Sequence, residues 1–427
     1  LYIDRLDSML GGHCVEEGLF YADDLAESAP ETFQILGEYV EHHRAEVAAG
    51  SDTKIRLMSR TDFVEQIIFK NGYDKNALIV GFNLPFDLTR IAIESSNAKK
   101  HFYGGISLEL VATGPEAKSR FRPRIVYKAL GSKRSLMQFT SPYRADVAQH
   151  EASKGQFLDL KTLGFALTDR SGSLESMSTS FGVPYMKRDV VHGVVSPDYI
   201  TYCREDVAAT TNLLRAELKE FERHPITLDP PAAYSPASIG KAYLPAMGIA
   251  PILNRQPDFP DRELGYAMTA YYGGRAECRI RKTFVPVTYV DFLSMYPTVN
   301  ALMGNWNHVI AENIVVVDAT EKVRDLLSSP ILASDCFDPI FWKQLFCFVE
   351  IVPDGDIVPV RANYNPHGTT MGIGINPFFS DRPSWFALAD LVTSVLLTGK
   401  VPKITQAFEL QASGQQQGLK PVKLRGT

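Results

Sequence analysis

Residues 288–298 read TYVDFLSMYPT and place one acid, Asp291, between an apolar run and a proline. The run that leads to Asp291 is β-branched and aromatic, which predicts a strand buried on both faces. Pro297 cannot donate a hydrogen bond to a ladder, so it marks where the chain leaves the strand for a turn or a helix. Asp291 then lies beside free amide groups, where a carboxylate can hold a divalent metal and a polyphosphate together. The alternative is an acid that caps the following helix.

A second acid follows an apolar run earlier in the chain. Residues 77–82 read ALIVGF, which predicts a buried strand, and the chain continues directly into NLPFD at residues 83–87. Pro85 suits the start of a helix, so Asp87 lies in the first turn of a helix that follows a strand. Taken alone, Asp87 is as well explained by a favourable interaction with the helix dipole.

A third acid lies on a long predicted helix over residues 197–221, which Pro197 and Asp198 open. Tyr202 and Asp206 are four residues apart, so their side chains share one face of this helix. Asp159 lies within another predicted buried strand, at residues 157–160. The pattern leaves two roles open for Asp159, support of an acidic site or a structural turn.

A glycine-rich stretch lies between Asp206 and Asp291 in the sequence. Residues 267–274 read AMTAYYGG and are followed by Arg275. Gly273 and Gly274 permit a close approach of the backbone or unusual dihedral angles. The alternative is a plain glycine turn between a helix and a hairpin.

In chain order, these patterns resemble the motifs of the family B DNA polymerases. DxxSxYP at residues 291–297 resembles the first polymerase motif, and NxxFD at 83–87 and YxxxD at 202–206 resemble the second and third motifs of the proofreading exonuclease. YxGG at 271–274 resembles the motif between the two domains, so the resemblance spans most of residues 1–310. Met295 stands where leucine is usual, which is a volume-conserving change.

The resemblance implies a role for each matching residue. Asp87 and Asp206 would bind metal at the exonuclease site, where Tyr202 would orient the attacking water. Asp291 would bind the catalytic Mg²⁺ of the polymerase site, with Mn²⁺ as an alternative ion. The residues implied to contact the incoming dNTP are Phe292, Ser294, Met295 and Tyr296, whose ring would exclude a ribose 2′-hydroxyl. The residues implied to contact DNA are Asn83, Phe86, Tyr271, Gly273, Gly274 and Arg275.

The implied activity is that of a DNA-directed DNA polymerase with 3′–5′ proofreading, which adds dNTPs to a primer by two-metal phosphoryl transfer. The implied partners are a DNA primer–template, single-stranded DNA, dNTPs and, in the members that start from a protein, a primer protein. The family's first exonuclease motif, DxE, is absent from residues 1–60, and no second palm aspartate or lysine-bearing fingers helix is recognisable before Thr427. We therefore expect a fragment of such a polymerase, inactive by itself.

Two other functions stay open. One is a free-standing 3′–5′ exonuclease with an unrelated C-terminal domain. The other is a non-catalytic nucleic-acid-binding relic of a polymerase. The net charge of −5 argues weakly against a dedicated nucleic-acid binder, although a large enzyme can carry a local basic channel on an acidic body.

Length and composition indicate a globular chain of two or three domains, with 427 residues of which 45% are hydrophobic and 22% charged. The five cysteines show no CxxC spacing, which argues against a zinc site and a disulfide framework and fits a reducing, cytoplasmic compartment. No run of 18 apolar residues occurs, so we expect no membrane span.

The predicted fold class is a multidomain combination of α/β and α+β. By the resemblance, residues 1–224 form an RNase H-like exonuclease domain without its first strand, 225–286 a connecting segment with the YxGG motif, and 287–427 a partial polymerase palm with an antiparallel sheet. Within the palm, we predict strands at 314–317 and 345–352 and a helix at 320–328. An irregular loop is predicted at 357–380 and a helix at 384–397.

Overall fold

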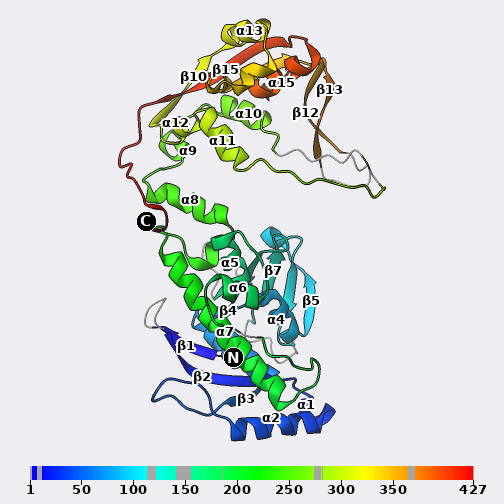
Figure 1. Cartoon of the computed structure of the whole chain (residues 1–427), viewed down its shortest axis with the longest axis vertical. Coiled ribbons are helices and arrows are strands. Elements are labelled where there is room, and N and C mark those ends of the chain that lie inside the picture. Colours follow the sequence, from blue (N-terminus) through cyan, green and yellow to red (C-terminus); the bar gives the residue numbers. More distant parts are fainter. Residues whose placement is uncertain are drawn as a thin grey trace. The chain divides into compact units, whose positions relative to one another are not determined.

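The computed structural model describes residues 2–6, 12–112, 122–140, 155–185, 187–273, 280, 282–363 and 371–426, without the side chains of residues 2–6, 12, 101 and 426. The chain is a mixed α/β protein with several antiparallel sheets (Figure 1). Contacts divide it into two compact units, unit 1 (Leu1–Ala246 with Pro421–Thr427) and unit 2 (Met247–Lys420). The three-part division of the sequence stays a prediction.

Unit 1 contains three sheets and most of the helices of the described chain. Its elements are β1 (Tyr2–Leu6), β2 (Gly12–Tyr21), α1 (Leu25–Ser28), α2 (Pro30–His42), β3 (Arg56–Ser59), α3 (Arg60–Phe63), the π-helical η1 (Val64–Asp74), β4 (Leu78–Gly81), α4 (Leu84–Ile91), β5 (Glu94–Asn97), η2 (Lys100–Phe102), β6 (Ile106–Glu109), β7 (Ile125–Ala129), β8 (Ser135–Phe139), β9 (Gln156–Asp159), α5 (Leu160–Thr168), α6 (Leu174–Ser180), α7 (Pro197–Glu222), η4 (Pro230–Ala232), α8 (Pro236–Ala246) and η6 (Leu424–Gly426). The sheets have the strand orders β1-β2-β3, β4-β9 and β5-β6-β7-β8.

The predicted strand and helix around Asn83 are confirmed as β4 and α4. β4 runs parallel to β9, with Gly81 opposite Asp159. Burial of the strand is less complete than predicted, since Leu78 to Val80 are half-buried. Among the described strands only β9 pairs with β4, so one edge of β4 lacks the neighbour that would bury it.

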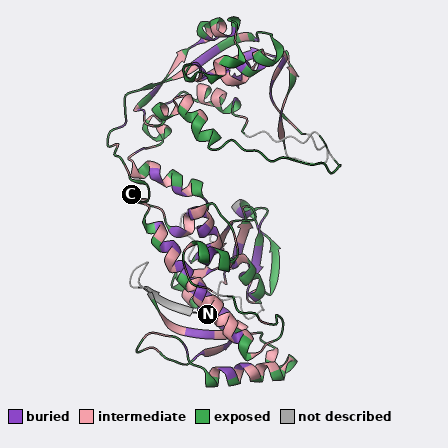
Figure 2. Cartoon of the chain, in the orientation of Figure 1, coloured by how far each residue is buried: buried purple, intermediate pink, exposed green. Residues whose placement is uncertain are grey.

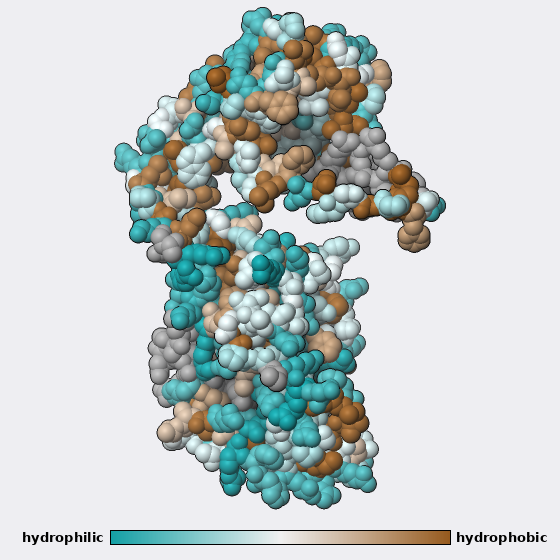
Figure 3. Space-filling model, in the orientation of Figure 1, coloured by the Kyte–Doolittle hydropathy of each residue, from teal (hydrophilic) through white to brown (hydrophobic). Residues whose placement is uncertain are grey.

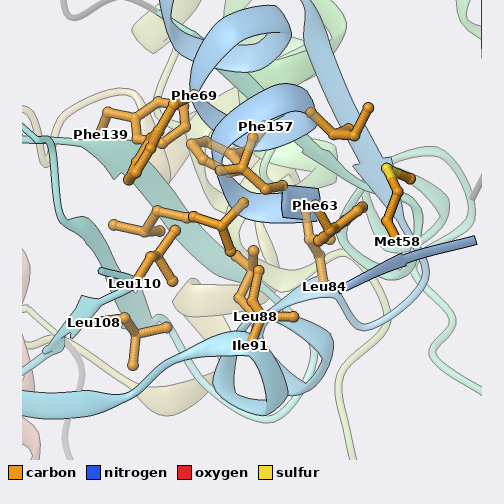
Figure 4. Close-up of a cluster of buried hydrophobic side chains, with 14 residues drawn as sticks. Met58, Phe63, Phe69, Leu84, Leu88, Ile91, Leu108, Leu110, Phe139 and Phe157 are labelled. Carbon is orange, nitrogen blue, oxygen red and sulfur yellow. The ribbon is translucent and has the colours of Figure 1, made fainter. Parts of the chain in front are cut away.

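The core beside β4 and α4 is built from helices and from strands of all three sheets of unit 1. Figure 4 shows aromatic and aliphatic side chains from these elements turned toward one another, with Leu88 and Ile91 of α4 among them. The buried members are Met58, Phe63, Val64, Ile67, Ile68, Phe69, Leu84, Leu88, Ile91, Leu108, Leu110, Ile125, Phe139 and Phe157. α4 is therefore fixed by three of its own buried side chains.

The predicted long helix is confirmed as α7, which begins where the sequence indicates. The side chain of Ser196 caps it by accepting a hydrogen bond from Tyr199 N, and Pro197 occupies its first turn. Ile200, Leu213 and Leu218 lie on its buried side. α7 packs against α5, α6 and α2, so one helix connects several layers of unit 1.

Unit 2 is built on the antiparallel sheet β10-β15-β11-β14 and the separate pair β12-β13. Its elements are α9 (Ile252–Arg255), α10 (Asp261–Thr269), α11 (Met295–Leu302), α12 (Asn305–Val309), β10 (Asn313–Asp318), α13 (Thr320–Ser328), η5 (Ala333–Phe337), α14 (Pro339–Trp342), β11 (Cys347–Val352), β12 (Asp354–Ala362), β13 (Gly372–Phe379), β14 (Ser384–Ala387), α15 (Leu388–Thr398) and β15 (Lys403–Ser413). The predicted antiparallel sheet, its strands at 314–317 and 345–352 and the helix at 320–328 are confirmed.

The strand predicted before Asp291 is wrong for this structure. Residues 284–292 form no ladder, and Val287 and Tyr289 are 82% and 90% exposed. The stretch is drawn as exposed in Figure 2, and Figure 3 shows hydrophobic side chains on the surface of unit 2. β-branched and aromatic residues favour an extended backbone, but a strand also needs a neighbouring strand, and none of the described strands pairs with this one.

Two further predictions in unit 2 need correction. The stretch predicted as an irregular loop contains β12 and β13, which pair antiparallel from Asp354 opposite Phe379 to Ala362 opposite Gly372. The helix predicted from Ser384 begins only at Leu388, because Ser384 to Ala387 pair with β11 as β14. In both cases cross-strand pairing overrides local composition.

No helix of the described residues combines the length and the apolar character needed to cross a bilayer. Of the cysteines that the structure describes, Cys203, Cys336 and Cys347 carry free thiols.

Candidate functional site

The turn between β4 and α4 presents the first group of predicted site residues. Asn83 adopts a left-handed conformation (φ 63°, ψ 43°) and is the N-cap of α4. Its carbonyl accepts a hydrogen bond from Phe86 N at 2.9 Å, which closes the turn. Asp87 follows in the first turn of α4, and its Oδ2 would lie 3.6 Å from a Cβ placed on Gly81. The predicted strand–turn–helix setting of Asp87 is thus confirmed.

Asp159 holds this turn from a different strand. Its Oδ1 accepts hydrogen bonds from Asn83 N at 2.7 Å and Leu84 N at 3.2 Å. Its Oδ2 accepts a bond from Thr162 Oγ1 at 2.9 Å, and only 6% of the residue is exposed. This geometry shows an acid that holds the turn carrying Asp87, and its support of an acidic site stays a prediction.

Three carboxyl groups interact electrostatically in this part of unit 1. Burial, and next the charge of Asp159, raise the pKa of Asp87 to about 6, although the residue keeps an exposed surface. Burial raises the pKa of Asp159 as well, against its hydrogen bonds, which lower it. Burial, followed by the charge of Asp159, raises the pKa of Glu217 well above its usual value. Repulsion of this kind is relieved by a bound cation or by a proton.

Glu217 is a buried acid that the sequence analysis missed. It is fully buried on α7, and neither carboxylate oxygen has a hydrogen-bond partner. Its Oε1 lies against α5, where a Cβ on Gly164 would approach it to 2.7 Å. The surrounding α7 sequence shows a helical core face, but a glutamate four residues after Leu213 gives no local sign of which way it points.

Asp206 of α7 is surrounded by tyrosine hydroxyls. Tyr185 donates a hydrogen bond to Asp206 Oδ1, and Tyr202, one turn earlier on α7, interacts electrostatically with this carboxylate. Burial, and then the interaction with Asp206, raise the pKa of Tyr202 to about 12 and raise that of Tyr185 as well. The predicted pairing of Tyr202 with Asp206 on one helix face is confirmed, whereas Tyr185 lies in a segment without a recognisable motif.

The segment around Tyr185 is attached to α7 at two more points. Arg188 pairs with Glu205 through bonds of 3.0 and 2.6 Å. The His192 ring meets the edges of Tyr199 and Tyr202 at centroid distances of 6.0 and 5.8 Å. These contacts keep the two tyrosine hydroxyls beside the Asp206 carboxylate.

The two predicted exonuclease acids have separate sets of described partners. Asp87 interacts with Asp159, whereas Asp206 interacts with Tyr185 and Tyr202. Where the chain is described, no group of three or more His, Cys, Asp or Glu residues has an arrangement that could hold a metal ion. The crowded carboxylate of Asp87 is a suitable hard-oxygen ligand for Mg²⁺, and so is that of Asp206, but the joint site stays a prediction.

Phe86 lies on the exposed side of the turn. It is 52% exposed, and the guanidinium carbon of Arg90 lies 4.6 Å from the centre of its ring. An exposed aromatic ring beside a cation can stack on a base and attract a phosphate. This arrangement is compatible with the predicted contact of Asn83 and Phe86 with DNA, which stays a prediction.

Neither of the cavities in unit 1 is formed around the predicted acids as a pair. A cavity of about 20 Å³ beside Asp159 and Ser135 has room for about one water molecule and none for a nucleotide. A larger cavity, about 430 Å³, lies between β2, α2 and α7 and has an apolar lining that includes Tyr199 and Cys203 but neither Tyr202 nor Asp206.

The YxGG stretch is held by an arginine of β12. Arg361 donates hydrogen bonds to the carbonyls of Tyr271 and, at 3.4 Å, Thr269. Its guanidinium carbon lies 4.5 Å from the centre of the Tyr272 ring. Tyr271 is 73% exposed, and Gly273 has the positive φ of 78° that the predicted glycine turn requires. Gly274 and Arg275 lie outside the described residues.

The residues predicted to bind the metal and the dNTP lie on the surface of unit 2. Ser294 is left-handed (φ 55°) and is the N-cap of α11, without a side-chain capping bond. Asp291 is exposed and has no hydrogen-bond or ion-pair partner among the described residues. The capping alternative for Asp291 is therefore not observed either. Phe292, Met295 and Tyr296 are 77%, 46% and 69% exposed, so this segment presents its predicted ligands without a pocket around them.

Comparison of the chain with protein-family models, with curated proteins and with solved structures gives no match.

Proposed function

We propose that the chain belongs to a DNA-directed DNA polymerase of the family B type with an RNase H-like 3′–5′ exonuclease domain. In this proposal unit 1 carries the exonuclease site and unit 2 part of the polymerase palm. The proposal is supported by the order of the four motifs along the chain. It is also supported by the local structure around Asp87, Asp206 and Gly273.

The observation that carries the proposal is the setting of the exonuclease residues. Asp87 stands on a helix start directly after a strand, and Asp206 stands on a long helix with the Tyr202 hydroxyl against its carboxylate. A tyrosine hydroxyl beside a metal-binding acid is suited to orient a water molecule for attack on a phosphodiester. Tyr185, from outside α7, donates a hydrogen bond to the same carboxylate.

Asp87 and Asp206 would hold the divalent ions, which neutralise charge on the attacking and leaving oxygens of the phosphodiester. Tyr202 would fix the water, and Phe86 with Arg90 would hold the 3′ end of a DNA single strand. In unit 2, Asp291 would bind Mg²⁺ with an incoming dNTP, and the amides of residues 292–296 would receive the phosphates. The DNA template strand would pass over Tyr271 and the adjoining glycines.

Metal binding tests the proposal more directly than turnover does. The sequence predicts that this chain lacks the DxE acids of the exonuclease site and the second aspartate of the palm, so no turnover is expected. Each of four proteins is titrated with Mn²⁺, and the free ion is measured by electron paramagnetic resonance. The proteins are the wild-type chain, Asp87→Asn, Asp206→Asn and Asp198→Asn. Asp198 is an exposed acid in the first turn of α7 and serves as the matched control. We expect the affinity to fall about tenfold or more in the first two variants and to stay unchanged in the control.

Binding of a single-stranded oligodeoxynucleotide in Mg²⁺ is measured on the same proteins. We expect weaker binding in Phe86→Ala, because a stacked base contributes about 1–3 kcal/mol. Equal Mn²⁺ affinities in all four proteins would contradict the metal site, and absence of DNA binding would contradict the nucleic-acid function.

The exposure of Asp291 favours a second candidate, an exonuclease whose C-terminal part has no polymerase activity. The two candidates differ in whether Asp291→Asn weakens the binding of Mn²⁺ with dATP. A decrease about tenfold or larger supports the polymerase, and an unchanged affinity supports the exonuclease alone.

A further inference from the structure

We propose that Asp159 is a positioning residue of the exonuclease site, because its carboxylate caps α4 from the neighbouring strand and thereby fixes the turn that presents Asn83, Phe86 and Asp87. This inference rests on the proposed exonuclease function for its consequence, while the capping itself rests on geometry.

The turn at Asn83 depends on hydrogen bonds from outside the turn as well as on its own bond from Phe86 N to Asn83 O. Asparagine adopts a left-handed conformation more readily than most residues do, but the Asn83 side chain makes no capping bond to α4. The first amide groups of a helix have no partner within the helix. Asp159 Oδ1 is the partner of these amides, because it accepts hydrogen bonds from Asn83 N at 2.7 Å and from Leu84 N at 3.2 Å. A residue 76 positions later in the chain thus performs the task of an N-cap.

Asp159 is in turn held on its other side. Thr162 Oγ1 donates to Asp159 Oδ2 at 2.9 Å and accepts from Ser135 N at 3.2 Å. The parallel register sets Asp159 opposite Gly81, two residues before Asn83. The carboxylate is therefore connected to β8 and α5 as well as to the turn, and its orientation is determined by groups on three elements.

The first turn of α4 transmits this orientation to the predicted site. Asn83 O accepts from Phe86 N at 2.9 Å, so the position of Asn83 sets where α4 begins. Leu84, Leu88 and Ile91 anchor the buried side of α4. With that side fixed and the start of the helix capped, Phe86 and Asp87 have one defined orientation on the opposite side.

Four variants separate the steps. Asp159→Ala removes both acceptor oxygens, and Asp159→Asn keeps the shape and one acceptor oxygen for the two amides. Thr162→Val removes the hydroxyl that orients Asp159, and Lys161→Ala, between these two positions, is the control. Amide hydrogen exchange across residues 82–91 without metal reads the cap, and Mn²⁺ affinity reads the site.

We expect Asp159→Ala to lose protection at Asn83 and Leu84 and to lower Mn²⁺ affinity about tenfold or more. Asp159→Asn restores most of both, Thr162→Val lies between, and Lys161→Ala resembles the wild type. If Asp159→Ala does not fold, the intermediate effect of Thr162→Val in both measurements is the decisive result.

Two results overturn the inference. Unchanged exchange at Asn83 and Leu84 in Asp159→Ala and Thr162→Val rules out the cap, while a decrease in Mn²⁺ affinity in Asp87→Asn leaves the proposed function intact. The second result is a loss of protection at Asn83 and Leu84 without any change in Mn²⁺ affinity, either in Asp159→Ala or in Asp87→Asn. It overturns the positioning role together with the proposed exonuclease site.

Discussion

The segments at residues 83–91 and 294–302 share a local design but have different surroundings. Each begins with a left-handed residue, Asn83 or Ser294, has a proline in the first turn, and continues as a helix of 8 residues. α4 buries three side chains and is capped by Asp159, whereas α11 buries none and its N-cap makes no side-chain bond. A short sequence is enough to form the turn and the helix, and its packing depends on other parts of the chain.

The acids of the two segments differ in the same way. Asp87 shares its surroundings with Asp159, and burial, followed by the charge of Asp159, raises the pKa of Asp87 to about 6. Asp291 stands in an exposed stretch and has no described partner. The acid in unit 1 is therefore part of a network whose loss is measurable in stability, while the acid in unit 2 has no such network among the described residues.

The largest effect is expected from breaking the buried ion pair of α7. Arg204 pairs with Glu17, which is 1% exposed. Arg204→Met leaves that carboxylate buried without its cation and should reduce the free energy of unfolding of unit 1 by about 3–5 kcal/mol. The control Arg188→Met breaks an exposed pair with Glu205 and should cost less than about 1 kcal/mol.

Urea unfolding of these variants is followed by far-ultraviolet circular dichroism. The three tryptophans, Trp306, Trp342 and Trp385, lie in unit 2, so their fluorescence serves as an internal reference that unit 1 variants should leave unchanged. Equal costs for Arg204→Met and Arg188→Met would contradict the importance of burial.

The next effect compares α4 with the segment that precedes α11. Leu88 of α4 is 2% exposed, and Leu88→Ala should destabilise unit 1 by about 2–5 kcal/mol through lost burial and a cavity. Leu293, next to α11, is 92% exposed, and Leu293→Ala should change stability by less than about 0.5 kcal/mol. A cost above about 1 kcal/mol for Leu293→Ala, read by tryptophan fluorescence, would mean that this segment is packed in solution.

A smaller effect of opposite sign is expected at Glu217. Glu217→Met replaces two unpartnered buried oxygens by an apolar group of similar size and should stabilise unit 1 by about 1–3 kcal/mol at pH 8. Because burial raises the folded-state pKa of Glu217, the wild type loses stability as the pH rises through that pKa. The gain should therefore shrink at pH 4. Glu222→Met, an exposed control on α7, should show no such pH dependence.

The smallest effect concerns the pH dependence due to Asp87. Its folded-state pKa of about 6 exceeds the usual value of 3.8, so its contribution to stability is fully present below about pH 4 and is lost as the pH rises through 6. In the presence of a chelator, Asp87→Asn should raise the Tm relative to the wild type at pH 8 and not at pH 4. Asp198→Asn is the control, and an equal Tm difference at both pH values would contradict the raised pKa of Asp87.

Local sequence was sufficient for several elements of the site. The apolar run with Pro85 predicted β4 and α4, and Pro197 with Asp198 predicted the start of α7, because proline effects act over a few residues. The spacing of Tyr202 and Asp206 placed both on one face, and the structure adds the hydrogen bond from Tyr185 to Asp206. The strands and helix at 314–328 and the strand at 345–352 followed from the same kind of pattern.

Tertiary structure decided the rest. Asp159 reaches Asn83 across 76 positions, Tyr185 reaches Asp206 from a segment without a motif, and Arg361 holds Tyr271 from β12. The strand predicted before Asp291 did not form, although its composition favours one. A backbone preference is a property of neighbouring residues, whereas a ladder, a cap in trans or a buried acid requires a partner whose position is fixed only when the whole unit has folded.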